Sequence, residues 1–124
     1  MTETTPATTR EAILIFHFAD RMKSELLLAS GLLATVMQMQ GGEREGGKRL
    51  LLDYFRSLER EVALGQTLIK DQEMTRVRTV MTGLIGMVDA AMFADIQNHL
   101  TWVISTMTTY AQRAMQFLLD KKLL

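Results

Sequence analysis

Apolar side chains recur at alternating spacings of three and four residues along most of this sequence. The longest uninterrupted run lies near the end of the sequence and comprises Phe93, Ile96, Leu100, Val103, Met107, Tyr110, Ala114 and Phe117. Residues at this spacing lie on one face of an α-helix, so the run predicts a long helix with one apolar side. The only proline is Pro6, and beyond it no residue removes a backbone donor from a helix. The chain after its first residues is therefore predicted to be α-helical.

A first helix is predicted over residues 8–40. Its apolar face comprises Ile15, Ala19, Met22, Leu26, Ala29, Leu33 and Val36. Thr8 and Glu11 fit a capping box, in which the Thr8 hydroxyl accepts from the Glu11 amide and the Glu11 carboxylate accepts from the Thr8 amide. Gly41 and Gly42 end the helix, because glycine readily adopts the left-handed conformation that closes a last turn.

Residues 41–47 combine four glycines with three charged side chains, and this composition predicts a flexible loop. A second helix is predicted over residues 47–70. Its apolar stripe comprises Leu51, Phe55, Leu58, Val62, Gly65 and Ile69, and charged residues occupy its other faces. The second helix is thus predicted to have one buried and one solvated side.

The stripe meets polar residues after Ile69, which predicts a turn near Asp71, a residue suited to cap the next helix. A third helix is predicted over residues 72–89. Its apolar face comprises Val77, Val80, Leu84 and Met87. Gly83 and Gly86 lie inside this helix, where each costs up to about 1 kcal/mol against alanine, so we expect them to mark close contact with another helix.

The fourth helix is predicted over residues 92–122. Four helices with short connections predict an all-α, antiparallel four-helix bundle, with one domain over residues 8–124 and a disordered tail over residues 1–7. Two regions carry more apolar surface than one inward stripe needs, namely Leu26–Leu28 with Leu32 and Leu33, and Trp102–Ile104. A helix that is apolar on most faces is buried on most faces, so we expect dimerisation to complete the bundle.

The sequence has 14 Lys and Arg residues and 14 Asp and Glu residues, and its formal net charge is +0. This balance lacks the basic excess of nucleic-acid-binding proteins, so no nucleic-acid partner is expected, and it leaves little repulsion between copies. The N-terminus lacks the features of a secretory signal and the chain lacks cysteine, which suits a cytoplasmic protein. The uncharged stretches Leu26–Gly42 and Ile96–Gln112 are shorter than the ~20 apolar residues of a membrane span, so none is expected.

Each of the two histidines has an aspartate within one helical turn, giving the pairs His17 with Asp20 and Asp95 with His99. The four side chains could together supply a metal ion with two carboxylates and two imidazoles. Bundle di-metal proteins instead use Glu-x-x-His on two helices, a motif that this sequence lacks. In an up-down-up-down bundle the two histidines also lie toward opposite ends, whereas a continuous rod over the second and third helices would let them approach. We predict no metal site and retain these four residues as the candidates.

No catalytic or cofactor motif is found. The hydroxyl groups between Thr101 and Thr109 have no base at a spacing that would activate a nucleophile. The glycines of residues 41–47 are not followed by the Gly-Lys-Ser/Thr ending of a phosphate-binding loop. A single histidine, His99, is insufficient for a phosphotransfer site. We therefore expect a non-enzymatic protein without a cofactor.

The expected function is protein–protein interaction. The first and fourth helices are predicted to form a homodimer interface, with Leu28, Leu32, Trp102 and Ile104 in contact. Ten methionines can fill irregular space in the core or, alternatively, form a groove for the helix of a partner protein. Two other functions stay open, namely binding of a metal or small ligand at the two His/Asp pairs, and action as a chaperone or adaptor for one dedicated partner.

Overall fold

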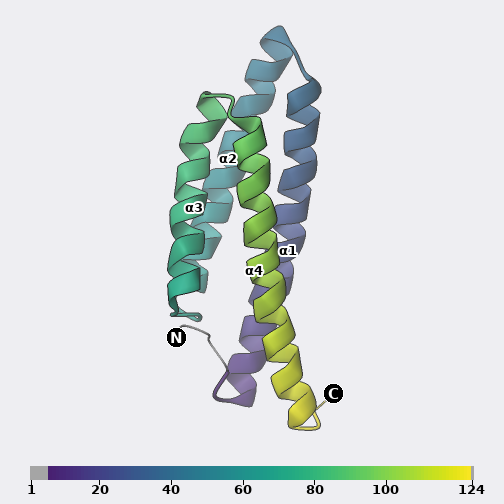
Figure 1. Cartoon of the computed structure of the whole chain (residues 1–124), viewed down its shortest axis with the longest axis vertical. Coiled ribbons are helices and arrows are strands. Elements are labelled where there is room, and N and C mark those ends of the chain that lie inside the picture. The colour runs from purple at the N-terminus through teal and green to yellow at the C-terminus, as the bar shows by residue number, and fades with distance from the viewer. Residues whose placement is uncertain (1–5, 124) are drawn as a thin grey trace.

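The computed structural model describes residues 6–123 and consists of four α-helices in up-down-up-down order (Figure 1). The helices are α1 (Thr9–Gln38), α2 (Gly41–Gly65), α3 (Gln72–Asp89) and α4 (Phe93–Asp120). Helix α1 packs on α2 and α4, and α3 packs on the same two helices, so the four enclose one core. The predicted all-α four-helix bundle is confirmed. Most of the tail predicted over residues 1–7 lies outside the described residues.

The apolar faces predicted from residue spacing form the core sides of α1 and α2. Every residue of the predicted α1 face is buried, from Ile15 to Val36. The α2 stripe is likewise buried from Leu51 to Ile69, and the predicted α4 face is buried as far as Ala114. The three-four spacing therefore identifies the inward side of these helices residue by residue.

The predicted core residues are partly wrong at the end of α4 and along α3, where the buried face lies a fraction of a turn away from the predicted one. Near the end of α4 it is Leu118 that is buried, whereas Phe117 is half-buried and the Lys121 ammonium lies over its ring, 5.4 Å from the centroid. The buried residues of α3 are Met74, Val77, Met81, Leu84 and Val88. Val80 and Met87 are only half-buried, and Val80 lines a groove toward α4 instead of entering the core.

Side chains cap the N-termini of α1 and α3 as the sequence predicts. The Thr8 hydroxyl accepts from the Glu11 amide at 3.1 Å, and the Asp71 carboxylate accepts from the Met74 amide at 2.9 Å. The Glu11 carboxylate departs from the predicted capping box, because it accepts from the Ala7 amide at 3.3 Å and not from the Thr8 amide. Both caps satisfy backbone donors that lack a partner inside the helix.

The prediction of a flexible loop over residues 41–47 is wrong. Helix α1 ends two residues earlier than predicted, and α2 begins at Gly41 after a connection of residues 39–40. The Arg44 guanidinium holds this corner, because it donates to the Met37 carbonyl at 2.8 Å and lies over the Phe93 ring, 5.3 Å from the centroid. These contacts offset the low helix propensity of the glycines.

Close helix contact occurs at a different glycine from those predicted. Gly65 is the last residue of α2, which ends before the predicted residue 70, and it is buried against α1. A Cβ atom at Gly65 would lie only 2.1 Å from Cζ of Phe18. Gly83 and Gly86 instead face open space, so the expected contact at these positions of α3 is wrong.

The helices differ in length, and the longest ones project beyond the core. Helix α1 has 30 residues and α4 has 28, against 18 in α3. The first turns of α1 and the last turns of α4 consequently extend past the end of α3 (Figure 1). Ile13, Leu14 and Leu119 are exposed on these turns. Despite their length, none of the helices within residues 6–123 has an apolar stretch that could cross a membrane.

Candidate functional site

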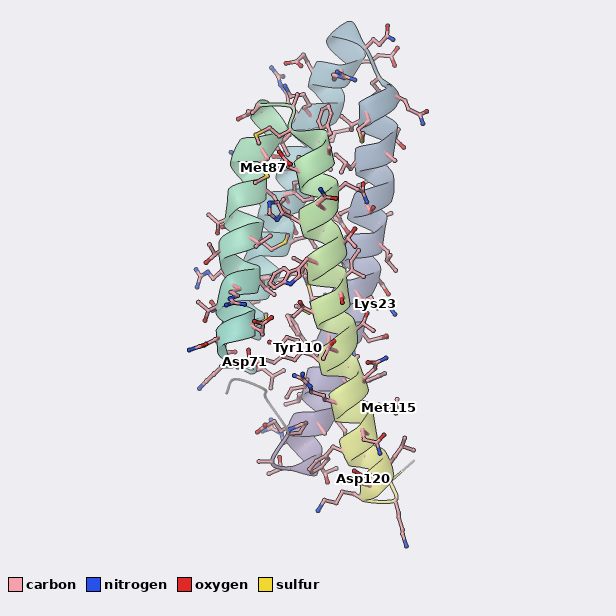
Figure 2. The ribbon with its side chains drawn as sticks, viewed as in Figure 1. Lys23, Asp71, Met87, Tyr110, Met115 and Asp120 are labelled. Atoms are coloured by element: carbon pink, nitrogen blue, oxygen red, sulfur yellow. The ribbon has the colours of Figure 1, made fainter. Side chains whose placement is uncertain are left out.

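Two grooves run along α4, one on each side. The α1–α4 groove has a volume of about 490 Å³ and is lined by Phe16, Asp20, Lys23, Thr108, Ala111, Gln112, Met115 and Gln116. The α3–α4 groove has two parts of about 390 Å³ and about 290 Å³, which both include Trp102. Figure 2 labels Lys23 and Met115, which line the α1–α4 groove, and Tyr110, which lines the α3–α4 groove.

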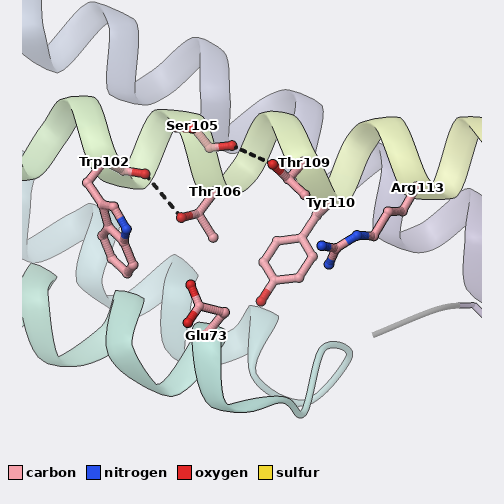
Figure 3. A pocket seen from close by; sticks show the side chains of 7 residues that line it. All are labelled: Glu73, Trp102, Ser105, Thr106, Thr109, Tyr110 and Arg113. Carbon is pink, nitrogen blue, oxygen red and sulfur yellow. Dashed lines mark hydrogen bonds between the residues drawn. The ribbon is translucent and has the colours of Figure 1, made fainter. Parts of the chain in front are cut away.

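The larger part of the α3–α4 groove is polar. Glu73 of α3 faces Trp102, Tyr110 and Arg113 of α4 across it (Figure 3). Glu73 also accepts from the Arg76 guanidinium at 3.0 Å on its own helix. The groove thus brings one acidic and two basic side chains together, and Trp102 forms its apolar end.

Tyr110 fixes the position of α3 against α4. Its hydroxyl donates to Oδ1 of Asp71 at 2.6 Å, and the same carboxylate oxygen caps the first turn of α3. Only 2% of the Tyr110 surface is exposed, and this burial, with the hydrogen bond to Asp71, raises the pKa of its phenol far above the usual range. Tyr110 therefore keeps its proton at neutral pH and acts as a structural hydrogen-bond donor.

The hydroxyl groups along α4 donate to carbonyl oxygens of their own helix. Thr106 donates to Trp102 at 3.1 Å, and Thr109 donates to Ser105 at 3.1 Å, as Figure 3 shows. Thr108 does the same toward Ile104 at 2.9 Å on the opposite side of the helix. Because each hydroxyl proton is already bonded to a backbone carbonyl, these side chains give α4 an uncharged surface whose removal from water costs little free energy.

The structure keeps the two predicted His/Asp pairs apart. The hydrogen bond from Gln97 to Ser30, at 2.7 Å, sets the start of α4 beside the back half of α1. His17 lies thirteen residues, about 20 Å, nearer the N-terminus of α1, so it is far from His99 along the bundle. Asp20 and Asp95 stay with their respective histidines. Among residues 6–123, no three His, Asp or Glu side chains are grouped closely enough to hold a metal ion.

The outer face of α1 carries large apolar side chains in contact with solvent. Leu27 is 52% exposed and Leu28 is 56% exposed, on either side of the exposed Ser24 and Gly31. Nothing lies within 4 Å of the Cβ position of Gly31, so no other segment of residues 6–123 covers the surface at this position. No charged residue occurs between Glu25 and the end of α1.

The four predicted interface residues lie on three different surfaces. Leu28 and Leu32 are exposed on α1, and each lies two turns after a residue that contacts α2, Arg21 and Glu25 respectively. Ile104 is half-buried, and its spacing from Thr108 places it on the side of α4 that lines the α1–α4 groove. Trp102 lies in the α3–α4 groove, so one flat interface over α1 and α4 cannot contain all four side chains.

Polar contacts close the other side of α1, where it meets α2. The Tyr54 hydroxyl donates to the carboxylate and to the carbonyl of Glu25, and Arg21 forms an ion pair with Glu61. Burial and the Glu25 carboxylate raise the pKa of the Tyr54 phenol above its usual range. The outer face of α1 thus lies between an ionic border with α2 and the groove with α4, whose charged lining residues are Asp20 and Lys23.

The methionines lie mostly in or near the core. Met22, Met74, Met81 and Met107 are fully buried. Met39, Met87 and Met115 are half-buried, and Met115 lines the α1–α4 groove. Their main role is therefore to fill space between the helices.

The geometry defines a class of protein, an up-down-up-down four-helix bundle with grooves on both sides of its last helix. Comparisons with models of protein families, with curated proteins and with solved structures find no match to this chain.

The α1–α4 groove was not predicted from the sequence, although a signal for it exists. Phe16, Asp20, Lys23 and Leu27 alternate in spacings of four and three beside the core face of α1. The same alternation in Ile104, Thr108, Ala111 and Met115 follows the core face of α4. A second periodic stripe next to a core stripe indicates a border with a neighbouring helix, but only the structure shows which helix that is.

Proposed function

We propose that the protein is a homodimeric interaction module that associates through the outer faces of α1 and α4. The observation that carries this proposal is the pair Leu27 and Leu28, each more than half exposed on an uncharged helix face. Large apolar side chains in an uncharged surrounding are typical of surfaces that a partner covers. A second copy fits because the net charge is +0, which leaves no overall repulsion between two chains.

The size of the face suits a dimer interface. At 1.5 Å per residue, the 30 residues of α1 extend for about 45 Å, and two adjacent helices are about 20 Å wide. Their outer surface is therefore about 900 Å² in projection, close to the roughly 800 Å² that each partner contributes to a standard interface. The α4 hydroxyls, already bonded within their helix, add contact area at a small desolvation cost.

Sedimentation velocity at micromolar concentration tests the proposal directly. We expect a dimer for the wild type and a folded monomer for Leu27→Glu, with at least a 100-fold increase in the dimer Kd, because the substitution introduces a charge on the apolar face of both copies. Leu50→Glu is the matched control, since Leu50 is 74% exposed on α2 and lies outside the proposed interface. A monomeric wild type, or equal loss of dimer in both variants, would contradict the proposal.

A further inference from the structure

Two stripes of side chains border the α1–α4 groove. The α1 stripe comprises Phe16, Asp20, Lys23, Leu27, Ser30 and Ala34, and the α4 stripe comprises Gln97, Thr101, Ile104, Thr108, Ala111 and Met115. In both stripes the spacing alternates between four and three residues. Side chains at this spacing form one continuous row along each helix.

Two charged side chains line the groove. Asp20 and Lys23 are the only charged residues of the two stripes, and they have opposite signs. Neither forms an ion pair with another side chain in residues 6–123. Around them the α1 stripe is apolar, with Phe16 one turn below Asp20 and Leu27 one turn above Lys23.

The segment of the α1 stripe between Asp20 and Lys23 is level with the segment of the α4 stripe between Ile104 and Thr108. The Ser30–Gln97 hydrogen bond sets the register of these antiparallel helices, and counting seven residues along each helix from it places Lys23 beside Ile104. The same counting places Asp20 beside Met107 and Thr108. The midpoint between Asp20 and Lys23 is therefore level with the midpoint between Ile104 and Thr108.

We infer that the second copy packs face to face and antiparallel, about a two-fold axis that crosses α1 and α4 between Asp20 and Lys23. This inference rests on the proposed dimer and specifies its geometry. Rotation about that axis brings Lys23 opposite Asp20 of the second copy, and Asp20 opposite its Lys23. The same rotation places Leu27 over the groove beside Phe16 of the second copy. The two α1 stripes thus form two ion pairs between Asp20 and Lys23 and two contacts between Leu27 and Phe16.

The alternative arrangement has its two-fold axis parallel to the helices, and it fits the charges poorly. In that arrangement α1 faces α4 of the second copy, whose stripe carries no charge. Asp20 and Lys23 would be removed from water without gaining a charged partner across the interface, which is costly. The antiparallel arrangement supplies that partner for both residues.

Charge exchange tests the inferred contact. We expect Lys23→Asp and Asp20→Lys each to raise the dimer Kd about tenfold or more, because each places like charges opposite one another. The double variant Asp20→Lys with Lys23→Asp restores opposite charges and should return the Kd to within about threefold of the wild type. Both positions are at least partly solvated, so circular dichroism should show unchanged helix content. A double variant as weak as the single ones would overturn the inferred geometry.

Disulfide formation tests the position of the axis, since the sequence has no cysteine of its own. Ser105 is exposed on α4 at the level of the axis, so Ser105→Cys should form a covalent dimer on mild oxidation. Ala94→Cys is the matched control, exposed on the same face three turns away, where the two copies lie about 33 Å apart. A dimeric wild type with equal cross-linking of both variants would overturn the geometry and leave the proposed dimer standing. A monomeric wild type would overturn both.

Discussion

Tyr110 shows how one polar atom fixes the relative position of two helices. Its ring lies among apolar side chains, and its hydroxyl reaches the carboxylate that begins α3. Asp71 consequently accepts both from the Met74 amide and from the phenol. A sequence that places aspartate at a helix start predicts the first of these bonds, but only the packing of α3 on α4 creates the second.

Replacement of Tyr110 by phenylalanine should destabilise the fold and flatten its response to alkali. At pH 8 we expect Tyr110→Phe to lower the free energy of unfolding by about 1 kcal/mol, the usual contribution of a hydrogen bond. The wild type should lose further stability as the pH rises above about 10, because an unfolded tyrosine releases its proton there while the folded Tyr110, whose pKa is raised, retains it. Below that pH the contribution of Tyr110 is fully present.

Urea unfolding between pH 8 and about pH 12 measures both effects of this substitution. The Tyr110→Phe variant should show a smaller fall in stability with pH than the wild type. Tyr54, whose pKa is also raised, accounts for a remaining slope, so Tyr54→Phe with Tyr110→Phe should be flatter still. Identical slopes in the wild type and in Tyr110→Phe would show that Tyr110 does not titrate differently in the folded state.

At the level of the helices, two glycines distinguish the effect of helix propensity on stability from the effect of packing between helices. Gly65→Ala should destabilise the protein by about 1–3 kcal/mol, because the new Cβ would meet the Phe18 ring between α1 and α2. Gly83→Ala should stabilise it by about 0.5–1 kcal/mol, since alanine is the better helix former and nothing lies within 4 Å of the added atom. Thermal or urea unfolding of both variants measures the difference. Effects of the same sign at the two positions would contradict the helix packing described here.

The sequence predicts each helix well where one pattern dominates. The apolar faces of α1 and α2 and the cap at Asp71 are found from spacing and residue type alone, because a buried stripe and an N-terminal carboxylate are local features. The helical start of α2 was missed, since it depends on Arg44 reaching Met37 and Phe93 across the fold. Glycine-rich composition indicates a loop unless such tertiary contacts override it.

The candidate site is less predictable, because it depends on which helices become neighbours. Excess apolar surface on α1 was predicted, and Leu28 is indeed exposed. Trp102 was placed with it, but the structure brings Trp102 beside α3 and leaves it in a different groove. A helical repeat gives the angle between two side chains on one helix, not the identity of the helix that each one faces.

The molecule has a charged half, formed by α2 and α3, and a half with fewer charges, formed by α1 and α4. Helices α2 and α3 carry the ion pairs Arg56 with Asp53 and Arg76 with Glu73 on their surfaces. The second half of α1 and α4 from Ile96 to Gln112 carry no charge at all. Surface ion pairs contribute little to stability but keep a surface hydrated, so the charged half is suited to remain in water. The half formed by α1 and α4, which has fewer charges, is the side on which a second copy can bind at the lower desolvation cost.

Association through this half links the stability of the fold to protein concentration. A dimer that dissociates on unfolding gains stability as concentration rises, because only the folded chain binds a second copy. From about 2 to about 200 µM, the Tm of the wild type should rise by about 5 °C, given the unfolding entropy of two chains of this length. Leu27→Glu should have a Tm that is independent of concentration, whereas Leu50→Glu should follow the wild type, as both leucines are exposed but only Leu27 lies on the surface formed by α1 and α4. Scanning calorimetry of the three proteins at both concentrations measures these shifts, and a constant wild-type Tm would mean that the exposed leucines of α1 stay in contact with water.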